Sequence, residues 1–246
     1  MRRLAIFVEG LTEELFVERF LTETTRNRGV RIEKLRASGG KVAKRSFTRV
    51  TSSADSPHLK VYVLIVNCGA DNRVKSEISD QYDSLVAKGY KTIIGIRDAY
   101  PQAKKFTEVP NLRKSLAYKI RPKPCDVIFV LAVMEIEAWF ISEHTHFPRI
   151  SAKLTLEQIK KSMGYDPSKT DMQRRPYPAK DLAAIYHLAK IQYMKEEASI
   201  RRTLNALDFR RMHAEFGSKF EDLRVFIEKI DKLLPVAAEA QSGPQK

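Results

Sequence analysis

The chain has 246 residues, of which 43% are hydrophobic, and a formal net charge of +14. This composition supports a hydrophobic core and excludes global disorder, and the longest apolar run, near 127–133, is far shorter than the roughly 20 residues of a membrane span. The basic excess is +9 over 1–150 and +5 over 151–246, which favours a nucleic-acid partner; a basic protein without such a partner is the alternative.

The N-terminus is charged and then apolar, as in secretory signal peptides. Here Glu9 and Glu13 interrupt the apolar stretch, and no small-residue cleavage pattern follows. The two cysteines, Cys68 and Cys125, are too few for a thiolate zinc site, and cytosolic thiols usually stay reduced. We therefore expect a soluble cytoplasmic protein with no membrane segment.

Short apolar runs alternate with amphipathic segments over the first two-thirds of the chain. They predict strands over 4–8, 30–35, 60–66, 92–96 and 126–133, and helices over 13–22 and 74–88. Thr12 is the expected N-cap of the first helix, and Gly89 the stop of the second. A glycine turn at 38–41 leads into a basic segment, and 51–57 is expected to be a loop. This alternation predicts an α/β fold with a mainly parallel sheet flanked by helices.

The pattern changes after Ile141. Four helices with no strand between them are predicted over 154–163, 180–189, 196–207 and 220–234. We expect an α/β domain over 1–150, a helical C-terminal region over 151–240 packed on it, and a disordered tail over 241–246.

Carboxylates follow three of the predicted strands. Glu9 follows the first strand, Asp98 the strand over 92–96, and Glu135 and Glu137 the strand over 126–133. Because ligands and catalytic groups collect at the carboxyl ends of parallel strands, we expect these acids to converge. In a strongly basic protein, such a cluster indicates a metal-dependent enzyme that acts on a polyanion. The alternatives are helix-dipole charges for Glu9 and Glu13 and a turn for Asp98. Glu135 and Glu137 could likewise be the N-terminal pair of a helix.

These segments resemble the Toprim-like superfamily of topoisomerases, primases and nucleases, which implies a Rossmannoid α/β fold. Val8-Glu9-Gly10 with Thr12-Glu13 is similar to its first-strand glutamate motif, and 94–100 to the strand that normally ends in Asp-x-Asp. Asp98 matches the first aspartate, and Tyr100 stands where the second would be. The chain is most similar to a bacterial Toprim-like group of unassigned chemistry found beside ATPases in defence loci. That group carries an aspartate followed by tyrosine and then a Glu-x-Glu-Ala segment, as at 134–138, and 193–195 resembles it more loosely.

The resemblance implies a nuclease that uses Mg²⁺ or Mn²⁺. The residues that it marks as catalytic are Glu9, Glu13, Asp98, Glu135 and Glu137, and the expected metal ligands among them are Glu9, Asp98, Glu135 and Glu137. Glu9 could act as a ligand or in proton transfer, and we favour Glu137 as the replacement for the missing second aspartate. Magnesium prefers oxygen ligands and keeps several waters, so two or three carboxylates suffice.

Basic side chains are numerous, and eight are candidates for contacting a phosphate backbone. They are Lys41, Lys44, Arg45, Lys104, Lys105, Arg174, Arg175 and Lys195. For each of them, a solvated surface charge is the alternative.

The sequence thus predicts a Mg²⁺-dependent nuclease of DNA or RNA in bacterial antiviral defence or nucleic-acid processing. One rival is a non-catalytic Toprim-derived module that binds nucleic acid or a separate ATPase chain. Another is nucleotidyl transfer, which the same kind of metal site supports.

Overall fold

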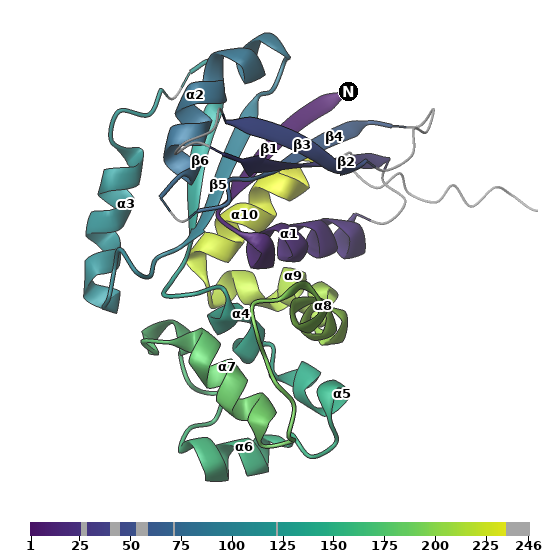
Figure 1. Cartoon of the computed structure of the whole chain (residues 1–246), viewed down its shortest axis with the longest axis vertical. Helices are drawn as coiled ribbons and strands as arrows, with labels where there is room; N and C mark the ends of the chain where they lie inside the picture. Colours follow the sequence, from purple (N-terminus) through teal and green to yellow (C-terminus); the bar gives the residue numbers. More distant parts are fainter. Residues whose placement is uncertain (26–28, 40–44, 53–58, 71, 122, 235–246) are drawn as a thin grey trace, which may run out of the picture.

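The computed structural model describes residues 1–25, 29–39, 45–52, 59–70, 72–121 and 123–234. A six-stranded sheet in the order β3-β2-β4-β1-β5-β6 occupies the upper half of the view in Figure 1, with α4 to α8 below it. The strands are β1 Arg2–Val8, β2 Val30–Ser38, β3 Ser46–Ser52, β4 Val61–Asn67, β5 Thr92–Asp98 and β6 Asp126–Ala132. β2 and β3 pair antiparallel, and the other neighbouring strands pair parallel. The predicted α/β fold with a mainly parallel sheet is confirmed.

Helices connect the strands and make up the region after β6. The α-helices are α1 Leu11–Thr24, α2 Val74–Ala87, α3 Val109–Ala117, α4 Glu137–Ser142, α5 Phe147–Ile150, α6 Leu156–Met163, α7 Pro178–His187, α8 Glu197–Ala206, α9 Phe209–Glu215 and α10 Glu221–Leu233. Short 3₁₀ turns are η1 Phe106–Glu108, η2 His144–His146, η3 Met172–Arg174 and η4 Phe216–Ser218. No helix among the described residues is long and apolar enough to cross a lipid bilayer.

Alternate residues of β1 pack into two cores on opposite faces of the sheet. Leu4 and Ile6 belong to a cluster that includes α1, α10 and other C-terminal helices, whereas Ala5 and Phe7 pack with α2. Figure 1 shows α1 and α10 on one side of the sheet and α2 on the other. Because both faces are covered, the central strands carry apolar runs, such as 4–8 in β1 and 61–66 in β4, which is why they could be predicted.

The C-terminal helices continue the first of these cores. Phe16 of α1 packs against Trp139 of α4 at 5.7 Å and against Phe209 of α9 at 5.8 Å between ring centroids. Phe20, one turn further along α1, lies 5.4 Å from Phe226 of α10. One hydrophobic cluster therefore runs from the sheet into the helical region.

Two local predictions were wrong. The N-cap of α1 is Gly10, not Thr12, because the chain is still extended at Gly10 and the Glu13 side chain accepts the Gly10 N–H at 3.0 Å. Thr51 and Ser52 belong to β3, not to a loop; residues 46–50 of this edge strand are exposed, so they carry no apolar pattern. The rest of the predicted loop over 53–57 and the predicted tail over 241–246 lie outside the described residues.

Candidate metal centre

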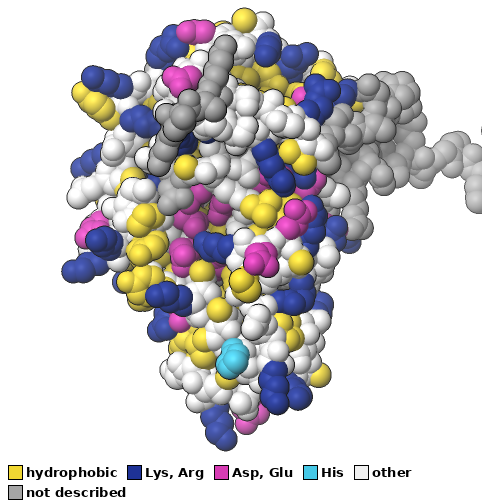
Figure 2. Space-filling view, in the orientation of Figure 1, with side chains coloured by type: hydrophobic (Ala, Val, Ile, Leu, Met, Phe, Trp, Pro, Cys, Tyr) yellow, Lys and Arg dark blue, Asp and Glu magenta, His cyan; other side chains and the backbone are white. Residues whose placement is uncertain are grey.

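Parallel pairing brings the ends of three strands to one edge of the sheet. Val8 of β1 pairs with Ile96 of β5, and Asp98, the last residue of β5, pairs with Ala132 of β6. The chain then turns through Met134, whose φ of 62° is left-handed, before α4 begins at Glu137. Figure 2 shows acidic side chains gathered around a basic one near the middle of this face.

Three of these acids approach closely enough to share a metal ion. Carboxylate oxygens of Asp98, Glu135 and Glu137 lie within 4.8 Å of one another, and we call these residues the carboxylate triad. Asp98 and Glu137 are buried, and Glu135 is partly exposed. Glu9, which the sequence also suggested as a metal ligand, does not belong to this group of carboxylates within 4.8 Å among the described residues.

Each member of the triad is oriented by a hydrogen bond. Asp98 Oδ1 accepts the N–H of Ile136 at 2.8 Å, and Glu135 Oε2 accepts the N–H of Ala179 at 2.8 Å. Glu137 Oε1 accepts the Tyr193 hydroxyl at 2.9 Å. The second oxygen of Glu137 is buried and has no hydrogen-bond partner among the described residues. A buried carboxylate oxygen without a partner is costly, so this atom is available to an external cation.

Lys195, in the loop before α8, provides the positive charge that faces the triad. Its Nζ lies 3.5 Å from Glu137, 3.6 Å from Glu135 and 3.8 Å from Asp98, while its side chain remains 47% exposed. Burial lowers the pKa of Lys195, but the three carboxylates outweigh burial and raise it. One ammonium is thus shared among three carboxylates and neutralises them only in part.

The remaining negative charge shifts the pKa values of the acids upward. The pKa of Asp98 is raised well above 3.8 by burial and then by the charges of Glu13, Glu137 and Glu9. Burial likewise raises the pKa of Glu137, although Lys195 opposes the shift. Such shifts mean that the ionised carboxylates are disfavoured without further positive charge, and a bound cation would stabilise their ionised form.

Glu9 and Glu13 line a cavity of about 410 Å³ beside the triad, together with Asp98 and Lys195. Glu9 Oε2 accepts the N–H of Asp98 at 3.2 Å, so it lies against the end of β5. Burial, with a contribution from Glu137, raises the pKa of Glu13 from 4.5 to about 7. Glu13 can therefore exchange a proton near neutral pH.

The triad fits a hard divalent cation. It provides carboxylate oxygens only, which suit Mg²⁺ or Mn²⁺, and one of these oxygens is buried without a partner. Lys195 already lies among the same oxygens, so a bound ion would compete with its ammonium or displace it.

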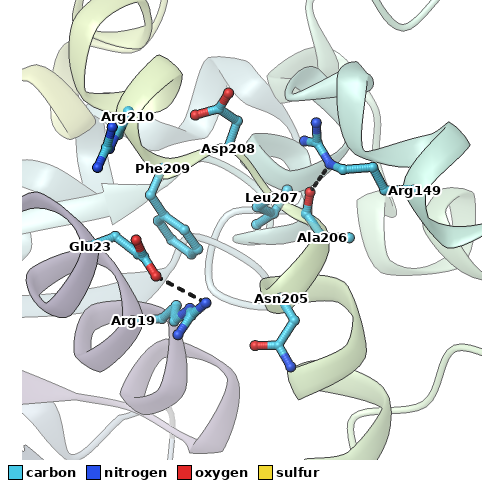
Figure 3. Close-up of a pocket in the computed structure, with 9 residues that line it drawn as sticks. All are labelled: Arg19, Glu23, Arg149, Asn205, Ala206, Leu207, Asp208, Phe209 and Arg210. Carbon is cyan, nitrogen blue, oxygen red and sulfur yellow. Dashed lines mark hydrogen bonds and ion pairs between the residues drawn. The ribbon is translucent and has the colours of Figure 1, made fainter.

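A second cavity, of about 360 Å³, lies where α1, α5, α8 and α9 meet (Figure 3). Arg19 pairs there with Glu23 at 3.0 Å, and Arg149 donates to the Ala206 carbonyl at 2.5 Å. None of its lining residues lines the cavity beside the triad. Because the carboxylates that could share a metal ion converge at the triad, we place the candidate site there.

Comparison with known proteins assigns a family. A family model described as "Domain of unknown function (DUF4276)" matches residues 8–226. The chain belongs to this family. No curated protein matches it. A crystal structure of a hypothetical protein from Pyrococcus horikoshii OT3 aligns over 96% of this chain and 97% of its own, with 13% sequence identity and a TM-score of 0.42.

The predicted phosphate-binding residues have different surroundings. Arg45 is held by Glu77 at 2.7 Å and by the Cys68 carbonyl at 2.6 Å, and Arg175 pairs through two hydrogen bonds with Asp181. Lys104 and Lys105 are exposed. Arg174 is also exposed, and Lys195 faces the triad. Lys41 and Lys44 lie outside the described residues.

One charged group was missed in the sequence. Glu14, fully buried in the first turn of α1, accepts two hydrogen bonds of 2.8 Å from Arg36 and one of 2.8 Å from Asn67. Burial alone would raise the pKa of Glu14, but these hydrogen bonds outweigh it and lower the pKa. Its partners are 22 and 53 residues away in the sequence, so no local pattern could reveal them.

Proposed function

We propose that this protein is a Mg²⁺- or Mn²⁺-dependent nuclease that hydrolyses phosphodiester bonds. The observation that supports this proposal best is the carboxylate triad: Glu137 holds a buried oxygen without a partner among the described residues, and Asp98 lines a cavity at the sheet edge. An ion bound there would polarise a phosphoryl group and stabilise the charge that develops on its oxygens.

The protein's own groups have separable roles in this proposal. Asp98, Glu135 and Glu137 bind the ion, and the hydrogen bonds to Ile136, Ala179 and Tyr193 orient them. Glu13, whose Oε2 accepts the Gly10 N–H, has a pKa raised to about 7 and would take or give a proton. Glu9 orients the end of β5 through the Asp98 N–H, and the Toprim resemblance also assigns it a part in the chemistry.

The net charge of +14 supports nucleic acid as the substrate, because a basic surface attracts phosphate and releases its counterions. The resemblance to Toprim-like proteins of defence loci favours a bacterial defence or nucleic-acid processing setting in the cytoplasm, with a separate ATPase chain as a possible partner. Nucleotidyl transfer would use the same carboxylates.

The direct test is cleavage of end-labelled DNA and RNA, each single- and double-stranded, in Mg²⁺, Mn²⁺ or EDTA. We expect cleavage of at least one substrate with a divalent ion and none in EDTA, because the carboxylates alone cannot neutralise the phosphate. Equal cleavage in EDTA would contradict the proposal, as would the absence of cleavage with either ion.

One observation favours a second function. Lys195 already places a positive charge among the triad carboxylates, as a permanent ion-pair network would. On this alternative the protein binds nucleic acid or a partner ATPase without catalysis, and no ion enters the site.

Replacing Lys195 with methionine separates the two functions. If a divalent ion competes with the ammonium, Lys195→Met should bind Mn²⁺ at least about tenfold more tightly than the wild type, because one repelling charge is removed. In EDTA the variant should lose about 1–2 kcal/mol of stability, less than for a fully buried pair because the side chain is 47% exposed. Isothermal titration calorimetry and urea unfolding measure the two effects.

Lys195→Arg, which keeps the charge, is the control and should resemble the wild type in both measurements. If Lys195→Met is destabilised and Mn²⁺ neither binds nor restores its stability, the ion-pair network is structural and the binding module is favoured.

A further inference from the structure

Three aromatic side chains come from the segments that follow β5 and precede α7. They are Tyr100, which is partly buried, and Phe106 and Tyr177, and we call them the aromatic surface. Phe106 is 40% exposed and Tyr177 is 42% exposed. The rings of Tyr100 and Tyr177 meet edge to face, with centroids 5.6 Å apart and planes at 85°.

The backbone ties both tyrosines to the triad. Tyr100 lies two residues after Asp98, and its N–H donates to the carbonyl of Met134, next to Glu135, at 2.9 Å. Tyr177 lies two residues before Ala179, whose N–H donates to Glu135 at 2.8 Å. Figure 2 shows hydrophobic and basic side chains directly beside the acidic group on this face. A ligand on these rings would therefore reach the carboxylates.

Cations accompany the rings. The guanidinium of Arg174 lies 4.8 Å from the Phe106 centroid, and the ammonium of Lys180 lies 4.5 Å from that of Tyr177. Lys104 and Lys105, two residues and one residue before η1, are exposed.

Acidic groups lie nearby but are fewer. Glu108 accepts the backbone N–H of Lys104 at 2.7 Å, and Asp171 pairs with Arg174 at 3.3 Å. The surface as a whole thus combines exposed rings with an excess of positive charge.

We propose that the aromatic surface stacks the unpaired bases of a single-stranded nucleic acid and leads the strand to the carboxylate triad. Proteins that bind single strands combine basic groups for the phosphates with aromatic rings for the bases. In a duplex the faces of the bases are already stacked on one another, so exposed rings gain contacts only with an unpaired strand. This inference rests on the proposed function for its choice of a nucleic-acid ligand.

Binding in EDTA tests the inference without cleavage. Fluorescence anisotropy would compare a labelled single strand, longer than the roughly 4–16 nucleotides of one site, with a duplex of the same sequence, as DNA and as RNA. The wild type should bind the single strand more tightly. Tyr177→Ala should weaken that binding about 5- to 150-fold, the loss that corresponds to one stacked base. Tyr177→Phe keeps the ring and should bind as the wild type does.

Tyr118 is the matched control. It is 65% exposed, and Lys75 and Lys119 lie 5.9 Å and 5.2 Å from its ring. It follows the C-terminal end of α3, whereas Phe106 precedes the N-terminal end. Tyr118→Ala should leave the affinity for the single strand unchanged, because Tyr118 lies outside the aromatic surface. An exposed tyrosine beside lysines is not expected to bind the strand by itself.

The outcomes separate this inference from the proposed function. If Tyr177→Ala weakens single-strand binding but the wild type cleaves nothing, the aromatic surface stands and the nuclease fails. If the wild type cleaves nucleic acid but binds duplex more tightly than single strand, the nuclease proposal is supported and the role of the aromatic surface is contradicted. The same conclusion follows if the wild type cleaves and Tyr177→Ala binds the single strand as tightly as Tyr118→Ala does. Absence of any nucleic-acid binding would also overturn the inference.

Discussion

Replacing Asp98 with asparagine should abolish metal-dependent stabilisation and nuclease activity together. Asp98 is a buried member of the triad, and asparagine keeps its shape while removing the charge that attracts the ion. The wild type should gain about 2.7 kcal/mol of stability when the ion is at a hundredfold excess over its dissociation constant, and the variant should gain almost none. Cleavage should fall more than about 100-fold, since second-shell changes at metal sites already cost 10–100-fold.

The same variant should be more stable than the wild type when no metal is present. Burial and the neighbouring acids raise the pKa of Asp98, so at pH 8 in EDTA this carboxyl costs the folded wild type free energy that asparagine does not. Asp126→Asn is the control: Asp126 begins β6, pairs with Lys229 at 2.7 Å, and its side chain is 53% exposed. It should change neither metal stabilisation nor cleavage. If Asp98→Asn retains both, Asp98 does not bind the ion.

The sequence was sufficient to predict the framework of the site. β1, β4 and β5 are buried over most of their length, so the sequence shows short apolar runs at 4–8, 61–66 and 93–96. Parallel pairing then requires that Glu9 and Asp98 lie at the same edge, and the Asp98 N–H to Glu9 distance of 3.2 Å agrees with that expectation. This part of the site could be predicted because burial on both faces of the sheet and the alternation of strands with helices are both visible in the local sequence.

Glu137 and Lys195 were both candidates in the sequence, but the contact between them could not be predicted, because it depends on segments that are distant in the sequence. Glu137 faces the same cation as Asp98 only because the chain turns at Met134 before α4 begins. Lys195 lies in an irregular loop with no hydrophobic period, and its position among the carboxylates follows from how α7 and α8 pack. The alternation that predicts strands is absent from β3, whose residues 46–50 are exposed.

The second large effect concerns Glu13 and Glu14, adjacent residues of α1 whose pKa values shift in opposite directions. Burial raises the pKa of Glu13 from 4.5 to about 7, whereas Glu14, although buried, has a lowered pKa because Arg36 and Asn67 donate hydrogen bonds to it. The first shift means that the folded state binds more protons than the unfolded state between pH 4.5 and about 7. The wild type should therefore lose stability over this range as pH rises, in the absence of metal.

Glu13→Gln should remove that loss, because glutamine can still accept the Gly10 N–H but does not ionise. At pH 8 in EDTA we expect its free energy of unfolding to exceed that of the wild type by about 3 kcal/mol, and the difference should vanish near pH 4. Glu14→Gln should have the opposite sign at pH 8, a loss of about 2–3 kcal/mol, because it breaks a buried charge pair. This loss should shrink as pH falls and Glu14 takes up a proton. Urea unfolding followed by circular dichroism at pH 4, 6 and 8 measures both curves. If Glu13→Gln is not more stable than the wild type at pH 8, Glu13 is not held among uncompensated acids, and the electrostatic basis for a cation at this site is lost.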